Sequence, residues 1–131
     1  MTKSVRTFLM FTGKAEEAID FYTTLIWDSR IESIERWGAG GPGKEGSVMR
    51  AAFTLYGTGF AASDSPIKHA FDFTPSTSLF VECSDEAEID RLFAVLSEGG
   101  QTLMPLGNYG FSRRFGWLND RYGVSWQLNL A

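Results

Sequence analysis

An internal repeat constrains the fold of this chain more than any other sequence feature. The segments 7–22 and 78–93 both pass from an apolar stretch, through an acidic start, into a helical pattern. Three residues of the first segment recur 70 positions later in the second, with Glu16, Ile19 and Asp20 matching Glu86, Ile89 and Asp90. Such self-similarity indicates two copies of one supersecondary unit.

Each copy carries one amphipathic helix. Apolar residues spaced at i, i+3, i+4 and i+7 form one stripe within 15–26 and another within 89–96. Asp85 stands three residues before Glu88, which is a capping-box arrangement, and Gly99-Gly100 can adopt the left-handed conformation that ends a helix. Each helix is therefore expected to cover a sheet with one of its faces.

Strand and turn signals follow each helix. The strands predicted in the first copy are 30–37, 47–55 and 60–63, with a glycine-rich loop at 38–46 and a turn at 56–59. In the second copy they are 101–104, 115–118 and 124–130, with a turn at 119–123. The halves, about 1–66 and 75–131, each read βαβββ.

The predicted fold class is thus α+β, with paired βαβββ modules forming a cupped, mostly antiparallel sheet that carries its helices on the outer face. The connection 65–77 has too few polar residues to be a flexible linker. Its apolar residues Phe71, Phe73 and Pro75 are expected to pack against the modules. We therefore expect residues 1–131 to form a single cooperative domain.

Charge and cysteine content argue against several functional classes. Twelve Lys and Arg against sixteen Asp and Glu give a net charge of −4, which predicts no binding to nucleic acid. No stretch of about 18 uninterrupted apolar residues occurs, and no signal-peptide cleavage site, so we expect no membrane partner and no export. Cys83 is the only cysteine, which excludes an intrachain disulfide and fits a cytoplasmic location. Within the predicted strand 78–83 it is expected to be a small buried hydrophobe.

Alternation along the strands separates side chains that face the helices from those that face away. The predicted helix-facing sets are Met49, Ala51, Phe53 and Leu55 in one strand and Val124, Trp126, Leu128 and Leu130 in another. Facing away are Arg50, Ala52 and Thr54; Ser125, Gln127 and Asn129; and Ser78, Phe80 and Glu82. A mixed polar and apolar second face suits a small-molecule site. The alternative is a plain solvent-exposed sheet face.

Three stretches, 11–22, 46–53 and 116–127, resemble the vicinal oxygen chelate superfamily, the fold of glyoxalase and bleomycin-resistance proteins. The last, Gly-Trp-Leu-Asn-Asp-Arg-Tyr-Gly-Val-Ser-Trp-Gln, is the most specific. More narrowly, the chain is similar to the PhnB-like subgroup, whose members are often labelled demethylubiquinone methyltransferase-like.

The resemblance implies where a metal would be held. Enzymes of the superfamily bind a divalent ion with four side chains, and those places fall near Thr7, at Arg50, near Ser78 and at Gln127. Only Gln127 could ligate in the usual way, and a protonated arginine repels a cation. We therefore expect no family-type metal site. Metal-assisted isomerase or dioxygenase chemistry, which needs such an ion, is then not expected either.

No cofactor is expected either. The glycines of 38–46 lie between strands, with no following helix to hold a nucleotide-type cofactor. We interpret this loop as a lid or a dimer contact. A structural role is the default for His69, with a catalytic base as the alternative, and Asp64 and Glu82 are further possible bases.

The leading hypothesis is a metal-independent small-molecule-binding protein of the glyoxalase fold. Arg50 would hold an anionic or carbonyl oxygen, Gln127 would hydrogen-bond the ligand, and Phe80 and Trp117 would add apolar wall. Thr7, Ser78 and Glu82 complete the predicted ligand-binding set, although Glu82 could instead neutralise Arg50 in a structural ion pair.

Two other classes stay open. The rival is a lyase, isomerase or dioxygenase-type enzyme of the same superfamily, either metal-dependent or cofactor-free. A structural or interaction module is the third reading, favoured only by a flat, filled second face. We also expect a homodimer with the glycine-rich loop and Trp37 at its interface, because exposed strand edges invite pairing.

Overall fold

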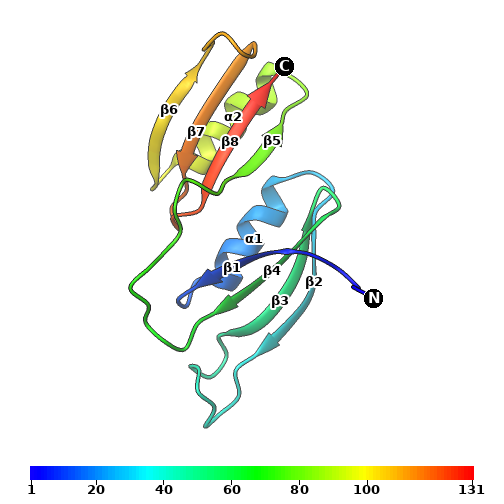
Figure 1. Cartoon of the computed structure of the whole chain (residues 1–131), viewed down its shortest axis with the longest axis vertical. Coiled ribbons are helices and arrows are strands. Elements are labelled where there is room, and N and C mark those ends of the chain that lie inside the picture. The colour runs from blue at the N-terminus through cyan, green and yellow to red at the C-terminus, as the bar shows by residue number, and fades with distance from the viewer. The chain divides into compact units, whose positions relative to one another are not determined.

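The computed structural model describes all 131 residues and shows an α+β protein with two helices and eight strands (Figure 1). The chain divides into two compact units, residues 1–69 and 70–131, and each contains one βαβββ module. The strands form two four-stranded sheets, one in each unit. The paired-module fold predicted from the repeat is confirmed.

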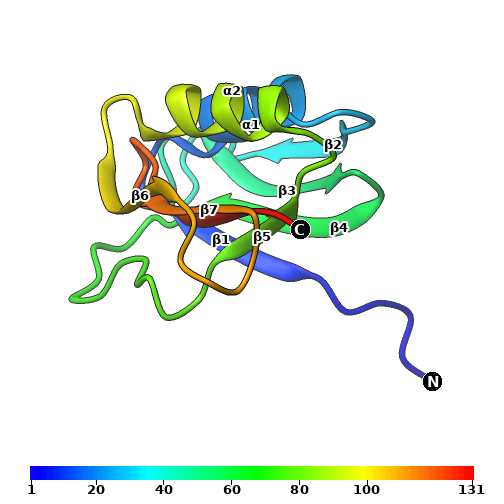
Figure 2. The ribbon, with the colours of Figure 1, turned by 90° about the horizontal axis from the view of Figure 1, so that it is seen from above.

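The first unit contains β1 (Thr7–Phe11), α1 (Ala15–Leu25), β2 (Arg30–Arg36), β3 (Val48–Leu55) and β4 (Thr58–Asp64). Its strand order is β1-β4-β3-β2, with β1 and β4 parallel and the other pairs antiparallel. α1 covers one face of the sheet and buries Ala18, Ile19 and Tyr22 (Figure 2). Between β3 and β4, Tyr56 and Gly57 have φ of 47° and 82°, as a two-residue type I′ turn requires.

The second unit repeats this plan with β5 (Leu79–Glu82), α2 (Glu86–Ser97), β6 (Gln101–Gly107), β7 (Arg114–Asn119) and β8 (Ser125–Leu130). Its order is β5-β8-β7-β6, again with the first and last strands of the module parallel. The predicted cap is present, since the Asp85 carboxylate accepts the Glu88 N–H at 2.8 Å. Gly99 follows α2 with φ of 75°, the expected left-handed conformation.

Neither helix is long and apolar enough to cross a lipid bilayer.

Two packing predictions fail locally. Met49 is 37% exposed, whereas the neighbouring Val48 is buried, because the β2–β3 register shifts between Glu35 and Arg36. Such an irregularity moves the alternation by one residue and turns Met49 away from the core. In the connection between the modules, Phe71 is exposed, while the predicted packing is seen for the half-buried Phe73, which lies beside Gly123.

Candidate functional site

The seven residues predicted to bind a ligand divide between the two units. Thr7 and Arg50 belong to the first unit, and the second holds Ser78, Phe80, Glu82, Trp117 and Gln127. In each unit the helix covers one sheet face, and we call the opposite face the open face of that unit.

Strand register arranges the open face of the second unit in rows across the sheet. Phe80 of β5 pairs with Gln127 of β8, and Gln127 pairs in turn with Trp117 of β7. Met104 of β6 extends this row beyond Trp117. We call Phe80, Gln127 and Trp117 the central row. The fold therefore places three of the predicted ligand-binding residues side by side.

A hydrogen-bonded network links the central row to the next row of the same face. The Trp117 indole Nε1 donates to Ser125 Oγ at 2.8 Å, and the Ser125 and Ser78 hydroxyl oxygens are 2.7 Å apart. Gln127 Nε2 donates to Ser78 Oγ at 3.3 Å. Four side chains, from the adjacent strands β7 and β8 and from the residue just before β5, thus hold one another in place.

Donor and acceptor requirements orient this network. Indole nitrogen can only donate, so Ser125 Oγ accepts from Trp117 and its own proton is available to Ser78. The Ser78 proton then points to the Pro75 carbonyl oxygen at 3.4 Å. Gln127 is held by its nitrogen alone, and its half-exposed carboxamide leaves Oε1 without a hydrogen-bond partner. The open face therefore presents an unused acceptor, Oε1, beside an unused second N–H of Nε2.

The sequence reasoning missed Ser125 as a member of this site. Ser125 is only 1% exposed, yet it joins Trp117 to Ser78. Its position on the same face as Gln127 was the available signal. Asn119, which pairs with Ser125 across β7 and β8, has a buried Oδ1 with no hydrogen-bond partner. The polar character of this face therefore extends beyond the predicted residues.

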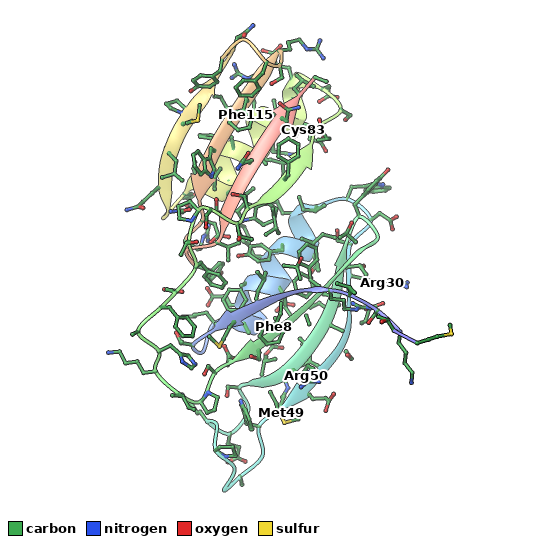
Figure 3. The ribbon with its side chains drawn as sticks, viewed as in Figure 1. Phe8, Arg30, Met49, Arg50, Cys83 and Phe115 are labelled. Atoms are coloured by element: carbon green, nitrogen blue, oxygen red, sulfur yellow. The ribbon has the colours of Figure 1, made fainter.

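Glu82 lies one row further along the same open face. Its carboxylate accepts a hydrogen bond from Asn129 Nδ2 at 3.0 Å, and Asn129 pairs with Phe115 of β7. Phe115, labelled in Figure 3, makes edge contacts with the rings of Tyr109 and Phe111, whose centroids lie 6.2 and 5.0 Å away. Aromatic side chains therefore border this end of the face.

In the first unit, Arg50 is an exposed residue of β3 (Figure 3). It stands opposite Glu35 in the β2–β3 ladder, but it makes no ion pair or hydrogen bond within the first unit. Thr7 shares its side of β1 with the buried Leu9 and Phe11. On this strand the residues that alternate to the open face are Phe8 and Met10.

Topology shows which residues of the two modules correspond. β4 is the counterpart of β8, because each pairs in parallel with the first strand of its module. The pair Met10 and Ser63 in the first unit matches the pair Phe80 and Gln127 in the second. Ser63, and not Arg50, therefore occupies the place equivalent to Gln127.

Asp64 is buried and its carboxylate is hydrogen-bonded to the backbone. Its carboxylate is 4% exposed and accepts the N–H groups of Gly13, Ala15 and Val48 at 2.7, 3.0 and 3.0 Å. These bonds tie the start of α1 and the start of β3 to the end of β4. With both oxygens occupied by backbone donors, Asp64 is poorly placed to act as a base.

His69 and Cys83 are also accounted for by their surroundings. The Nε2 atom of His69 lies 3.0 Å from the Ser65 hydroxyl oxygen, four residues earlier in the chain. Burial, aided by the nearby Glu88 and Glu82 carboxylates, raises the pKa of the Cys83 thiol to about 12. A thiol with that pKa is not a nucleophile near neutral pH, in line with the buried hydrophobe predicted from sequence.

The glycine-rich loop is organised around Trp37. The indole Nε1 donates to the Asp64 carbonyl oxygen at 3.2 Å. Gly43 lies against the indole ring so closely that an added Cβ would be 2.4 Å from ring atoms. Glycine at this position therefore lets the loop fold back onto the ring.

The residues at the implied metal places do not fit a divalent ion. No group of three or more His, Cys, Asp or Glu side chains is arranged to hold one. Gln127 uses its amide nitrogen toward Ser78, and the equivalent place in the first unit holds only the Ser63 hydroxyl.

The comparisons with known proteins agree with this architecture. Residues 3–129 match the family described as 3-demethylubiquinone-9 3-methyltransferase. The PhnB protein of Bacillus cereus is 57% identical, with 98% of this chain and 100% of that chain covered and a TM-score of 0.95. Protein PA1353 of Pseudomonas aeruginosa is 28% identical, with 98% of each chain covered and a TM-score of 0.85.

More distant structures share the fold alone. The fosfomycin resistance protein FosX of Listeria monocytogenes is 9% identical, with 100% of this chain and 94% of that chain covered and a TM-score of 0.62. No curated protein matches the chain.

Proposed function

From the premise that the chain belongs to the 3-demethylubiquinone-9 3-methyltransferase family, we propose that it is a small-molecule-binding protein that works without a family-type metal site. The resemblance to the vicinal oxygen chelate superfamily and its PhnB-like subgroup is confirmed. The glyoxalase-like fold is therefore established, and the binding role is our inference.

The observation that carries this proposal is the network on the open face of the second unit. Buried polar groups are costly unless they are hydrogen-bonded, so a purely structural sheet face has little reason to contain linked hydroxyls beside an indole. Here Trp117, Ser125 and Ser78 fix the carboxamide of Gln127 and leave its Oε1 unused. A preorganised acceptor between aromatic side chains is typical of a ligand-binding surface.

Arg50 supports a second, separate role in the first unit. Its guanidinium is exposed and has no partner within that unit, so it is available to an anion such as a carboxylate or phosphate, which its planar donor fork can bind bidentately. We therefore retain small anions among the ligands to be tested.

Methyl transfer is not part of the proposal, although the family description names it. The glycine-rich loop joins β2 to β3, and no helix follows it to receive a nucleotide-type cofactor. We infer that the loop is a contact surface of a homodimer and that the protein is cytoplasmic, where its single buried cysteine would stay reduced. Light scattering at micromolar concentration tests the dimer, and a mass of about 15 kDa would exclude it.

A thermal-shift panel tests the proposed function. Acetate, phosphate, toluene, 4-methylphenol and zinc chloride would each be titrated into protein purified without chelator. A ligand that binds only the folded state raises the melting temperature as its concentration passes its dissociation constant. We expect a shift with at least one organic or anionic compound and none with micromolar zinc. No shift with any compound would refute the binding role, and tight one-to-one zinc binding abolished by Gln127→Ala would refute the metal-free role.

A further inference from the structure

We propose that the open face of the second unit binds a neutral aromatic molecule that carries a hydroxyl group. The ring would lie between Phe80 and Trp117, and the hydroxyl would donate to Oε1 of Gln127. This inference rests on the proposed function and names the ligand class for the same face.

The central row has the spacing for one aromatic ring. Neighbouring strands lie about 4.8 Å apart, so Phe80 and Trp117, two strands apart, are separated by roughly 10 Å at the backbone. Carbon atoms in contact lie about 3.5–4 Å apart, so a ring touching both side chains fills most of that space. Phe80 is 55% exposed, so its ring offers apolar surface to a ligand. A planar ring would cover its surface and lie over Gln127.

The hydrogen-bonding state of Gln127 selects the polar group of the ligand. Because Nε2 donates to Ser78 Oγ at 3.3 Å, the carboxamide is oriented with Oε1 unused. The second N–H of Nε2 is unused too, so the carboxamide offers a ligand one acceptor and one donor. A carboxylate ionised at neutral pH can accept from the N–H but brings no donor to Oε1. A hydroxyl group supplies the donor without adding charge.

Charge on this face also disfavours an anion. Within the central row and the rows on either side of it, Glu82 is the only ionisable residue. Its carboxylate is exposed and already accepts from Asn129 Nδ2 at 3.0 Å, so solvent weakens its attraction for a cation. A neutral ligand avoids repulsion by Glu82 and loses no charge solvation when it binds beside the aromatic rings.

Four compounds that share one methyl-substituted ring separate these requirements. Toluene, 4-methylphenol, 4-methylbenzoate and 4-methylbenzylamine would be titrated into full-length isotope-labelled protein. The side-chain amide signals of Gln127 and the indole N–H signal of Trp117 report binding at the central row. We expect saturable shifts of these signals, with 4-methylphenol binding about threefold to tenfold more tightly than toluene, the factor that one net hydrogen bond supplies. The two charged compounds should bind more weakly than 4-methylphenol.

Substitutions provide the matched controls. Gln127→Leu keeps the volume and removes the acceptor, so the affinity for 4-methylphenol should fall to that for toluene. Asn129→Leu changes the same strand and face two residues away and should leave both affinities unchanged. Equal binding of toluene and 4-methylphenol by the unmodified protein, or tighter binding of either charged compound, would overturn the inference. If other compounds of the thermal-shift panel bind while 4-methylphenol does not, only this inference fails and the proposed function stands.

Discussion

The open faces of the two units differ far more than the faces that their helices cover. On the helix-facing side, both sheets bury apolar side chains, such as Ala62 of β4 and Trp126 of β8, which occupy equivalent places. On the open side, β4 presents Ala61 and Ser63 where β8 presents Ser125 and Gln127. The core face is restricted by packing against a helix, whereas the open face is free to diverge.

This difference localises the proposed chemistry. A row of Phe8, Ala61, Ala52 and Ser33 crosses the first sheet, and the equivalent row of the second sheet runs from Ser78 through Ser125 and Asn119 to Gln101. The first row has one hydroxyl group and no amide, while the second can form the network around Gln127. The two modules therefore provide similar scaffolds, and the linked hydroxyl and amide side chains lie on the open face of the second.

Buried carboxylates mark a second contrast. Asp64 in the first unit stands at the place of Leu128 in the second. The second unit instead buries Asp120 in the β7–β8 turn, where it accepts the Tyr122 and Val124 N–H groups and the Trp126 indole N–H at 2.8–3.0 Å. Each unit thus fastens its sheet with one acidic side chain, but at different points.

The largest expected effect comes from removing the fastening of the first unit. Asp64→Ala leaves the Gly13, Ala15 and Val48 N–H groups without their acceptor. Buried donors that lose a charged partner each cost about 1–3 kcal/mol, so we expect the free energy of unfolding to fall by about 3–5 kcal/mol. Urea denaturation followed by far-ultraviolet circular dichroism measures this change.

The same experiment examines how the units unfold. Glu45→Ala, at an exposed carboxylate, is the control and should change stability by less than about 0.5 kcal/mol. Because we expect one cooperative domain, the indole N–H nuclear magnetic resonance signal of Trp126 in the second unit should be lost with the same midpoint as circular dichroism reports. Two separated unfolding transitions would contradict the expectation of one domain. A loss of less than about 1 kcal/mol in the free energy of unfolding of Asp64→Ala would contradict the structural role of Asp64.

The next effect in size is the low reactivity of the Cys83 thiol in the core of the second unit. With its pKa raised to about 12 by burial, Cys83 has little thiolate at neutral pH. At about pH 8 a chromogenic disulfide should therefore react with Cys83 of the folded protein at least about tenfold more slowly than with an ordinary thiol, because the greater nucleophilicity of a high-pKa thiolate offsets only part of its scarcity. Reaction with a chromogenic disulfide, with and without urea, measures the ratio. Rapid labelling of folded protein would show that the core beneath β5 opens easily.

The sequence predicted the repeat, the two helices, all eight strands and the α+β class, because each depends on local periodicity. It misplaced Met49 because the β-bulge depends on pairing between two strands, which no single strand encodes. That Ser63 is the counterpart of Gln127 could be seen only from the strand pairing, because it depends on which strands are neighbours in each sheet.

The site was only partly predictable for a related reason. Alternation correctly grouped Phe80 with Ser78 and Gln127 with Ser125, since period two is a property of every strand. The network itself requires three strands in a particular register, and Ser125 gains its importance only there. The role of Asp64 was hidden as well, because its backbone partners lie up to 51 residues away in the chain.

A smaller effect should distinguish the two open faces by charge. Arg50 makes no ion pair in its own unit, so Arg50→Met should change the free energy of unfolding by less than about 1 kcal/mol, the limit for an exposed cross-strand pair with Glu35. Any stabilisation by acetate or phosphate should disappear in this variant. Anion-induced stabilisation that survives unchanged would remove Arg50 as the binding residue, while a loss of about 3–5 kcal/mol would reveal a buried carboxylate partner.

The smallest effect concerns the ion pairs that join a strand to the helix of each unit. In the first unit, Arg36 of β2 holds both carboxylate oxygens of Glu16 in α1 at 2.7 and 2.8 Å, and in the second, Arg114 Nε holds Asp90 Oδ1 at 2.8 Å. The two hydrogen bonds from Arg36 lower the pKa of Glu16 below its ordinary value of 4.5. Because the folded-state pKa is the lower one, the stability from this pair is present above about pH 4.5 and is lost as pH falls through the folded-state pKa.

Glu16→Gln should therefore reduce stability slightly near neutral pH and should lose its difference from the unmodified protein at acidic pH. Added salt should shrink the difference too, because both partners are exposed to solvent. Urea titrations between about pH 3 and pH 7, in low and high salt, measure this dependence, with Asp90→Asn as the matched variant in the second unit. A difference that persists below the folded-state pKa of Glu16 would mean that the side chain stabilises α1 through packing, since a protonated carboxyl no longer attracts Arg36. In that case the strand-to-helix contact of the first unit would depend on shape and not on charge.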